Sequence, residues 1–182
     1  MIPMGTRSLL IGAHHLLIHP LFVALAWTRL YGLPRDPRLW LAFFLHDLGY
    51  LGKPCMDDAR GETHPELGAR IMRRLCGEPW AELCLYHSRS YARAAGHPPS
   101  ALNAADKLAF ALEPRALYLP RVILTGEIHE YLARAGGQPG SKYGQDGPAL
   151  SGTLWHRACT WHAWATAHSR QAALDAHRHL HA

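Results

Sequence analysis

The chain has 182 residues, 48% of them hydrophobic, and a formal net charge of +5 at pH 7. This length and composition suit one globular domain with a sizeable core. The mild positive charge favours anionic partners, phosphorylated ones included. No run of five basic residues is present, so the sequence gives no sign of a polycationic arm, and long nucleic acid is not a required partner.

The sequence predicts a cytoplasmic protein without a membrane anchor. Its four cysteines form no CxxC pair, which favours reduced thiols. The apolar segment 9–26 is interrupted by His14, His15, His19 and Pro20 and lacks a clear small-residue cleavage site. We therefore expect neither a signal peptide nor a membrane-spanning segment here.

Helical periodicity dominates the chain, and no stretch shows the period-two alternation of a strand. Prolines at the first turn and glycines just after the last turn mark several helix ends. The expected helices cover residues 6–18 (Thr6–Ile18), 20–31, 37–45, 64–75, 79–87, 101–112, 121–135 and 153–181. The predicted fold class is thus an all-α bundle of about seven or eight helices.

The chain divides into three predicted parts. Residues 1–135 form the main bundle and carry the candidate site. Residues 136–152, rich in Gly, Pro, Ser and Gln, read as a linker or flap. Residues 153–182 form a C-terminal helix with three tryptophans that packs on the same domain, as a brace or lid, or that forms a homodimer interface.

One short stretch, Leu45–Gly49, places His46 and Asp47 side by side after an apolar run. Burying an imidazole or a carboxylate without a partner is costly, so this pair needs an explanation. The 14 histidines point to metal chemistry, because imidazole is the commonest metal ligand. Four further candidate ligands lie near an end or on one face of a predicted helix: His19, His64, His87 and Asp106.

These candidate ligands are not spaced as helical neighbours, so helix packing must assemble the site. For the first ligand, His14 and His15 remain alternatives to His19. Imidazole and carboxylate donors without thiolate suit Fe, Mn, Zn, Co or Ni better than a structural zinc finger.

The motifs around His19-Pro20, Leu45-His46-Asp47 and Asp106-Lys107 resemble the H…HD…D pattern of the HD-domain superfamily. The resemblance covers about residues 12–113. Members of this superfamily are all-helical, metal-dependent proteins, and most are phosphohydrolases, so the resemblance implies an HD-domain-like bundle.

Two further motifs, His64-Pro65-Glu66 and Tyr86-His87-Ser88, resemble the extra ligands of the dinuclear, six-ligand branch. That branch includes bacterial diadenosine-polyphosphate hydrolases, cyclic-dinucleotide phosphodiesterases and mixed-valent di-iron oxygenases. The short diadenosine-polyphosphate hydrolases are the most similar in length and ligand order. Many family members place a lysine three residues after the aspartate, where this chain has Tyr50, with Lys53 three residues further on.

The resemblance implies two divalent ions, with Fe or Mn favoured and Zn, Co, Ni or Mg as alternatives. Asp47 would bridge the two ions. His19, His46 and Asp106 would complete the coordination shell of one ion, and His64 and His87 that of the other. The implied activity is hydrolysis of a nucleotide or small phosphate ester through a metal-bound hydroxide. Asp47, Lys53 and Arg89 are the candidate catalytic residues. The candidate substrate-binding residues are Tyr50, Lys53, Arg89, Arg93 and Lys107.

Two other functions stay open at this point. One is oxidative cleavage of a phosphonate-like substrate by a mixed-valent di-iron oxygenase. Such oxygenases use a Tyr and a Glu ahead of the first histidine ligand, and residues 1–18 contain neither. The other is a non-catalytic nucleotide sensor that keeps the metal-binding fold.

Overall fold

The computed structural model describes residues 2–56, 58–135 and 147–179. Over these residues the chain forms ten α-helices, two short 3-10 helices (η1 and η2) and no strand, which confirms the predicted all-α fold class. In chain order the elements are α1 (Met4–Leu10), α2 (Ile18–Tyr31), α3 (Pro37–Leu45), η1 (Leu48–Tyr50), η2 (Gly61–Thr63), α4 (Pro65–Cys76), α5 (Glu78–Leu85), α6 (Arg89–Ala94), α7 (Ala101–Leu112), α8 (Arg115–Thr125), α9 (Glu127–Ala135) and α10 (Leu154–His179).

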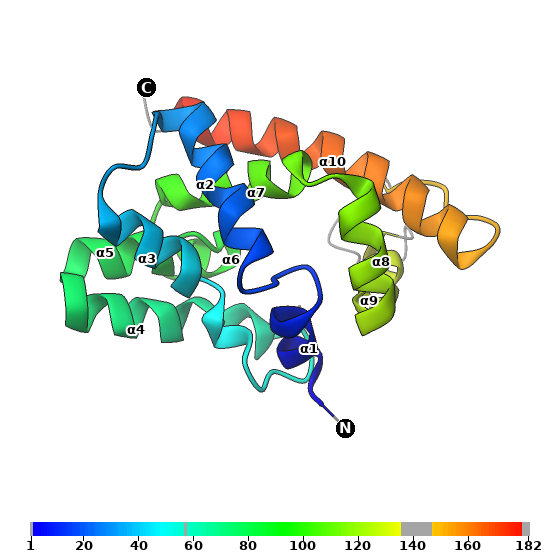
Figure 1. Cartoon of the computed structure of the whole chain (residues 1–182), viewed down its shortest axis with the longest axis horizontal. Helices are drawn as coiled ribbons and strands as arrows, with labels where there is room; N and C mark the ends of the chain where they lie inside the picture. The colour runs from blue at the N-terminus through cyan, green and yellow to red at the C-terminus, as the bar shows by residue number, and fades with distance from the viewer. Residues whose placement is uncertain (1, 57, 136–146, 180–182) are drawn as a thin grey trace.

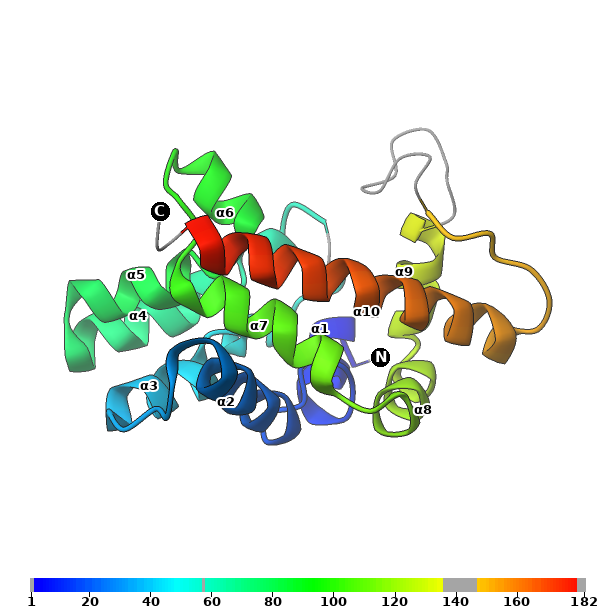
Figure 2. The same ribbon diagram turned by 90° about the horizontal axis from the view of Figure 1, so that it is seen from above.

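Helix α7 is the spine of the bundle. The long α10 runs along it, and α2 packs on another of its sides (Figure 2). Helices α3, α4 and α5 pack on one another at one end of the molecule, and α8 and α9 lie at the other end (Figure 1). The short α1 lies against η1 and α8.

Three main apolar clusters hold these helices together. One joins α2, α3 and α7 through residues such as Val23, Phe43 and Leu102. A second lies between α3, α4 and α5 around Met72. The third joins α8, α9 and α10 around Trp161. The C-terminal helix is therefore packed into the bundle along much of its length.

The start of the chain departs from the prediction. The sequence predicts one helix over Thr6–Ile18, but α1 ends at Leu10 and α2 begins at Ile18. Between them the Ala13 N–H lies 3.3 Å from Oε2 of the buried Glu127 and donates to it. In a continuous helix this N–H would donate to a backbone carbonyl one turn earlier. Because it donates to the Glu127 side chain instead, the first helix does not continue through Ala13.

Two further differences raise the helix count from the predicted seven or eight to the ten observed. The predicted helix 121–135 is two helices, α8 and α9, because Gly126 between them adopts a left-handed conformation with φ of 86°. The short α6 was not predicted; it begins at Ser88, whose hydroxyl accepts from the Tyr91 N–H.

Most of the predicted linker or flap over 136–152 falls at 136–146, outside the described residues. Within the described part of the chain, none of the helices combines the length and the apolar character needed to cross a membrane.

Candidate metal centre

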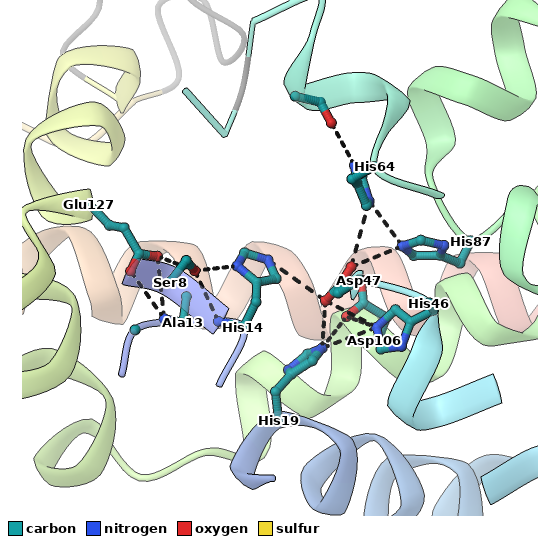
Figure 3. Close-up of polar contacts among 12 residues, drawn as sticks. Ser8, Ala13, His14, His19, His46, Asp47, His64, His87, Asp106 and Glu127 are labelled. Atoms are coloured by element: carbon teal, nitrogen blue, oxygen red, sulfur yellow. Dashed lines mark hydrogen bonds and ion pairs between the residues drawn. The ribbon is translucent and has the colours of Figure 1, made fainter. Parts of the chain in front are cut away.

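Six side chains from separate elements meet at one place between the helices (Figure 3). Five of them are buried, and the sixth, Asp106, is partly exposed. Helix packing brings all six side chains together, as the sequence predicts. Five of them lie at helix ends, and Asp106 lies on the face of α7 that points into the bundle. The six are His19 in the first turn of α2, His46 at the end of α3, Asp47 before η1, His64 before α4, His87 after α5, and Asp106 within α7.

Asp47 lies at the centre of the cluster, and one of its oxygens faces the first set of ligands. Its Oδ2 lies 3.3 Å from Nε2 of His19 and 3.2 Å from Nε2 of His46. Oδ1 of Asp106 lies 3.1 Å from the same His19 nitrogen. We call His19, His46, Asp106 and Asp47 Oδ2 the His19 half of the site.

The other oxygen of Asp47 faces a second set. Its Oδ1 lies 3.6 Å from Nε2 of His64 and 3.3 Å from Nε2 of His87. The two histidine nitrogens are 3.1 Å apart. We call His64, His87 and Asp47 Oδ1 the His64 half; a single carboxylate thus connects both halves.

The distances fit the edges of metal coordination shells. With metal–ligand bonds of about 2.1 Å, neighbouring ligand atoms lie about 3.0 Å apart in an octahedron and about 3.4 Å apart in a tetrahedron. In the His19 half, Oδ1 of Asp106 lies 3.1 Å from Nε2 of His19 and 3.8 Å from Nε2 of His46, and all four donor atoms lie within 4.8 Å of one another. The donors are therefore close enough to share one cation in each half.

Backbone carbonyls fix how three of the histidines face the centre. Nδ1 of His46 and Nδ1 of His64 each lie 2.9 Å from the carbonyl oxygen three residues earlier, and His87 makes the same contact. A carbonyl can only accept, so each Nδ1 carries the hydrogen. When such a ring is neutral, the lone pair of its Nε2 points into the cluster, which is the arrangement that metal-binding histidines use.

This arrangement calls for positive charge inside the cluster. The Nε2 lone pairs of His64 and His87 face each other at 3.1 Å. Oδ2 of Asp47 is buried without a hydrogen-bond partner among the residues that the structure describes. Facing lone pairs repel, and a buried carboxylate oxygen without a partner is costly, unless protons or cations lie between them. Divalent cations would satisfy all of these atoms together.

The His19 half attracts positive charge most strongly. Burial by itself lowers the pKa of His46, but the neighbouring carboxylates outweigh it and raise the pKa to about 10. They also raise the pKa of His19 against the effect of burial. Burial by itself raises the pKa of the Asp47 and Asp106 carboxyl groups. The neighbouring histidines outweigh burial and hold both pKa values well below the usual range of a carboxyl group. In the metal-free chain, His46 therefore carries a proton near pH 7.

The His64 half behaves differently. Burial, together with the nearby charge of His87, lowers the pKa of His64 to about 3. The ring of His64 is therefore neutral near pH 7 and already has the protonation state of a metal ligand.

His14 approaches the cluster without joining either half. Its Nε2 lies 3.9 Å from Oδ2 of Asp47, while its Nδ1 lies 2.9 Å from Ser8 Oγ (Figure 3). Ser8 donates its hydrogen to the Glu127 carboxylate, at 3.0 Å, so its oxygen is left to accept from His14 Nδ1–H. His15, the other alternative to His19, does not face the cluster. Its ring accepts hydrogen bonds from the backbone N–H groups at the start of α2.

Two connected cavities open onto the cluster. The large cavity, of about 570 Å³, is lined by Asp47, His64 and His87. The small cavity, of about 220 Å³, is lined by His19 and by aromatic side chains of the C-terminal helices. Both halves of the site are thus accessible to a small molecule.

Four of the five predicted substrate residues line the large cavity: Tyr50, Arg89, Arg93 and Lys107. Tyr50 stacks on the His64 ring at 4.1 Å between centroids. The fifth, Lys53, lines neither cavity. Its Nζ donates to Thr63 Oγ1, 2.5 Å away, so we no longer place Lys53 among the catalytic or substrate-binding residues.

Helix α10 contributes cavity residues that were not predicted from the sequence. Trp164, His168 and Ser169 line the large cavity together with Glu62 from η2. Only the three tryptophans gave a signal in this segment, and they do not reveal which face of a long helix meets the site. The structure finds that face because α10 packs along α7, next to Asp106.

Comparisons of the chain with protein-family models, curated proteins and solved structures gave no match. Fold and site together define an all-α protein with a buried histidine–carboxylate cluster suited to metal ions.

Proposed function

We propose that this protein is a metal-dependent phosphohydrolase that holds two divalent cations and acts on a nucleotide or another small phosphate ester. The observation that carries the proposal is the placement of Asp47, whose two oxygens face two separate sets of histidines. A carboxylate in this position would bridge two cations. The mixed imidazole and carboxylate donors favour iron or manganese, with zinc, cobalt, nickel and magnesium as alternatives.

We further propose that the chain is a six-ligand member of the HD-domain superfamily, similar to the short bacterial diadenosine-polyphosphate hydrolases. The order of the ligands along the chain, the convergence of all six and the all-α fold support this assignment. All four cysteines are free, which suits a reducing compartment such as the cytoplasm.

Bound divalent cations would supply positive charge to phosphate oxygens and would acidify water. The side chains around the large cavity add to this charge. Arg89, Arg93 and Lys107 line it together with only one acidic residue outside the ligand set, Glu62. A guanidinium group can bind two phosphate oxygens at once, so we assign the two arginines to substrate phosphate.

In ester hydrolysis, a water oxygen bonds to phosphorus while the ester P–O bond breaks. The electron pair of that bond leaves with the ester oxygen, which takes up a proton. His14 lines both cavities and can hold a proton at Nε2. Ser8 and Glu127 keep its ring in this orientation through the hydrogen bonds to Nδ1 and to Ser8 Oγ.

The test is metal analysis of the purified protein beside single variants. We expect two cations per chain in the parent and one in His64→Ala or His87→Ala. The exposed His129→Ala is the control and should keep both cations. An unchanged count in either of the first two variants would remove that histidine from the ligand set.

A panel of nucleotides and simple phosphate esters, assayed with manganese or iron, then tests the activity. Hydrolysis that proceeds without dioxygen supports the phosphohydrolase. Turnover that requires iron and dioxygen would support the oxygenase instead. Tight nucleotide binding without turnover at any metal would support the sensor.

A further inference from the structure

The small cavity differs in chemistry from the large cavity beside it. Its distinctive wall consists of four aromatic residues from α7, α8, α9 and α10: Phe110, Tyr118, Tyr131 and Trp161. Most of this wall belongs to the C-terminal helices, which lie outside the part of the chain that resembles the HD-domain superfamily. The candidate metal centre therefore opens into a compartment whose aromatic wall comes mostly from residues after 113.

The aromatic wall is rigid. Tyr131 stacks on Trp161 with 4.9 Å between centroids and 9° between planes. Phe110 meets Tyr118 edge to face at 5.0 Å. The Tyr131 hydroxyl donates to the buried Glu127 carboxylate at 2.9 Å, which fixes that ring. Rings fixed in this way form a binding surface that needs little ordering when a ligand arrives.

Polar side chains also line the small cavity, among them Lys107, Arg134 and Ser169. The Glu113 carboxylate at its edge is 4% exposed and is paired with Arg121. Ala13, Met56 and Ala165 complete the apolar lining. The aromatic wall and these small apolar side chains offer a face on which a flat ring can stack, while the polar side chains lie at other parts of the lining. The size is also suitable, because a dry apolar cavity of about 150 Å³ already holds benzene, and the small cavity measures about 220 Å³.

The two cavities meet at the metal centre. The residues that line both are His14, Tyr50, Asp106, Lys107, Ala165 and Ser169. A molecule that spans the junction would have one end among the arginines of the large cavity and the other end against the aromatic wall. The bond between its two ends would lie next to Asp106 and His14.

We propose that the small cavity is a subsite for a flat aromatic group carried on the leaving oxygen of the phosphate ester. This inference rests on the proposed phosphohydrolase function. The phosphate lies in the large cavity, the ring lies in the small cavity, and the oxygen that joins them lies at the junction beside His14. The C-terminal helices thereby select esters of aromatic alcohols or aromatic-bearing alcohols over simple alkyl esters.

The experiment measures binding to the full-length, metal-loaded protein by calorimetry, with 2-naphthyl phosphate and methyl phosphate as probes. Stacking on aromatic side chains should make the naphthyl ester bind about tenfold more tightly. Ala13→Leu fills the small cavity without removing the backbone N–H. We expect it to abolish the naphthyl preference and to leave methyl phosphate binding unchanged. Ala163→Leu, on the exposed face of α10, is the control and should keep the preference.

Equal binding of the two esters by the parent would overturn the inference, as would a full preference in Ala13→Leu. If Ala13→Leu does not fold, Phe110→Leu keeps the test decisive, because it removes one flat face and retains most of the apolar volume. It should weaken the naphthyl preference.

Turnover of the two esters separates the two proposals. Cavity-dependent binding without hydrolysis would contradict the phosphohydrolase and support the subsite. Equal hydrolysis of both esters, with no effect of Ala13→Leu on either, would support the phosphohydrolase and contradict the subsite.

Discussion

The two halves of the metal centre share Asp47 but differ in charge and surroundings. The His19 half contains oxygens from two carboxylates, whereas the His64 half contains one oxygen and two imidazoles. His46 lines neither cavity, while His64 and His87 both line the large one. Both halves border a cavity, but the extra carboxylate of the His19 half should hold a cation more tightly. We therefore expect a cation in the His64 half to exchange more readily than one in the His19 half.

The largest expected effect comes from the carboxylate that the halves share. Asp47→Ala removes a ligand from both, so we expect the metal content to fall from two cations per chain to near zero. Asp106→Ala affects the His19 half alone and should lose one. Elemental analysis of both variants, with circular dichroism to confirm folding, makes the measurement. If Asp47→Ala kept two cations per chain, the proposal that the Asp47 carboxylate bridges them would be wrong.

A second prediction concerns pH, and its effect is intermediate. Nearby carboxylates raise the pKa of His46 to about 10, whereas burial lowers the pKa of His64 to about 3. At about pH 8 the metal-free His46 carries a proton that a cation must displace, and His64 carries none. Loading the His19 half should therefore release protons, and its affinity should fall as the pH is lowered below about 10.

Calorimetric titration in two buffers with different ionisation enthalpies measures this proton release. The first binding event should depend on the buffer, and His46→Gln should reduce that dependence. If loading released no protons in either buffer, the assignment of the protonated half would be incorrect.

The smallest effect on metal content is expected from Glu127→Gln. Glu127 is fully buried and accepts hydrogen bonds from Ser8, Thr125 and Tyr131, but it touches neither half of the site. Losing its charge should lower the free energy of unfolding by about 1 to 3 kcal/mol, measured by denaturant titration. The cation count should stay at two.

The matched control is the exposed Glu82→Gln, which should change neither quantity. A loss of one cation in Glu127→Gln would show that the loop carrying His14 supports the metal centre directly.

The six clustered residues could be predicted from the sequence because each stands beside a local signal. His46 and Asp47 follow an apolar run, His64 precedes a proline, and Asp106 lies within a clearly apolar helix. Local patterns set these positions on their helices, and the resemblance to the H…HD…D pattern predicted their order. Helix packing could then be expected to bring them together.

The parts that could not be predicted depend on contacts between residues far apart in sequence. The first helix stops early because Glu127, 114 residues away, accepts a hydrogen bond from Ala13. Nothing near residue 13 encodes that contact. Lys53 was expected at the site from its spacing after Asp47, but the loop directs its amine to Thr63. The α10 residues that line the cavities could not be predicted, because the sequence does not show which face of that helix lies on α7.

Helix α7 carries both Asp106 and Phe110, four residues apart, and therefore on neighbouring turns of one face. At a rise of 1.5 Å per residue, this separation is about 6 Å along the helix axis. Because a helix is stiff, the interval between the reacting phosphorus and the stacked ring would be nearly constant. Esters with a short linker would match this interval, whereas a long flexible tether would fold back or strain to reach both ends.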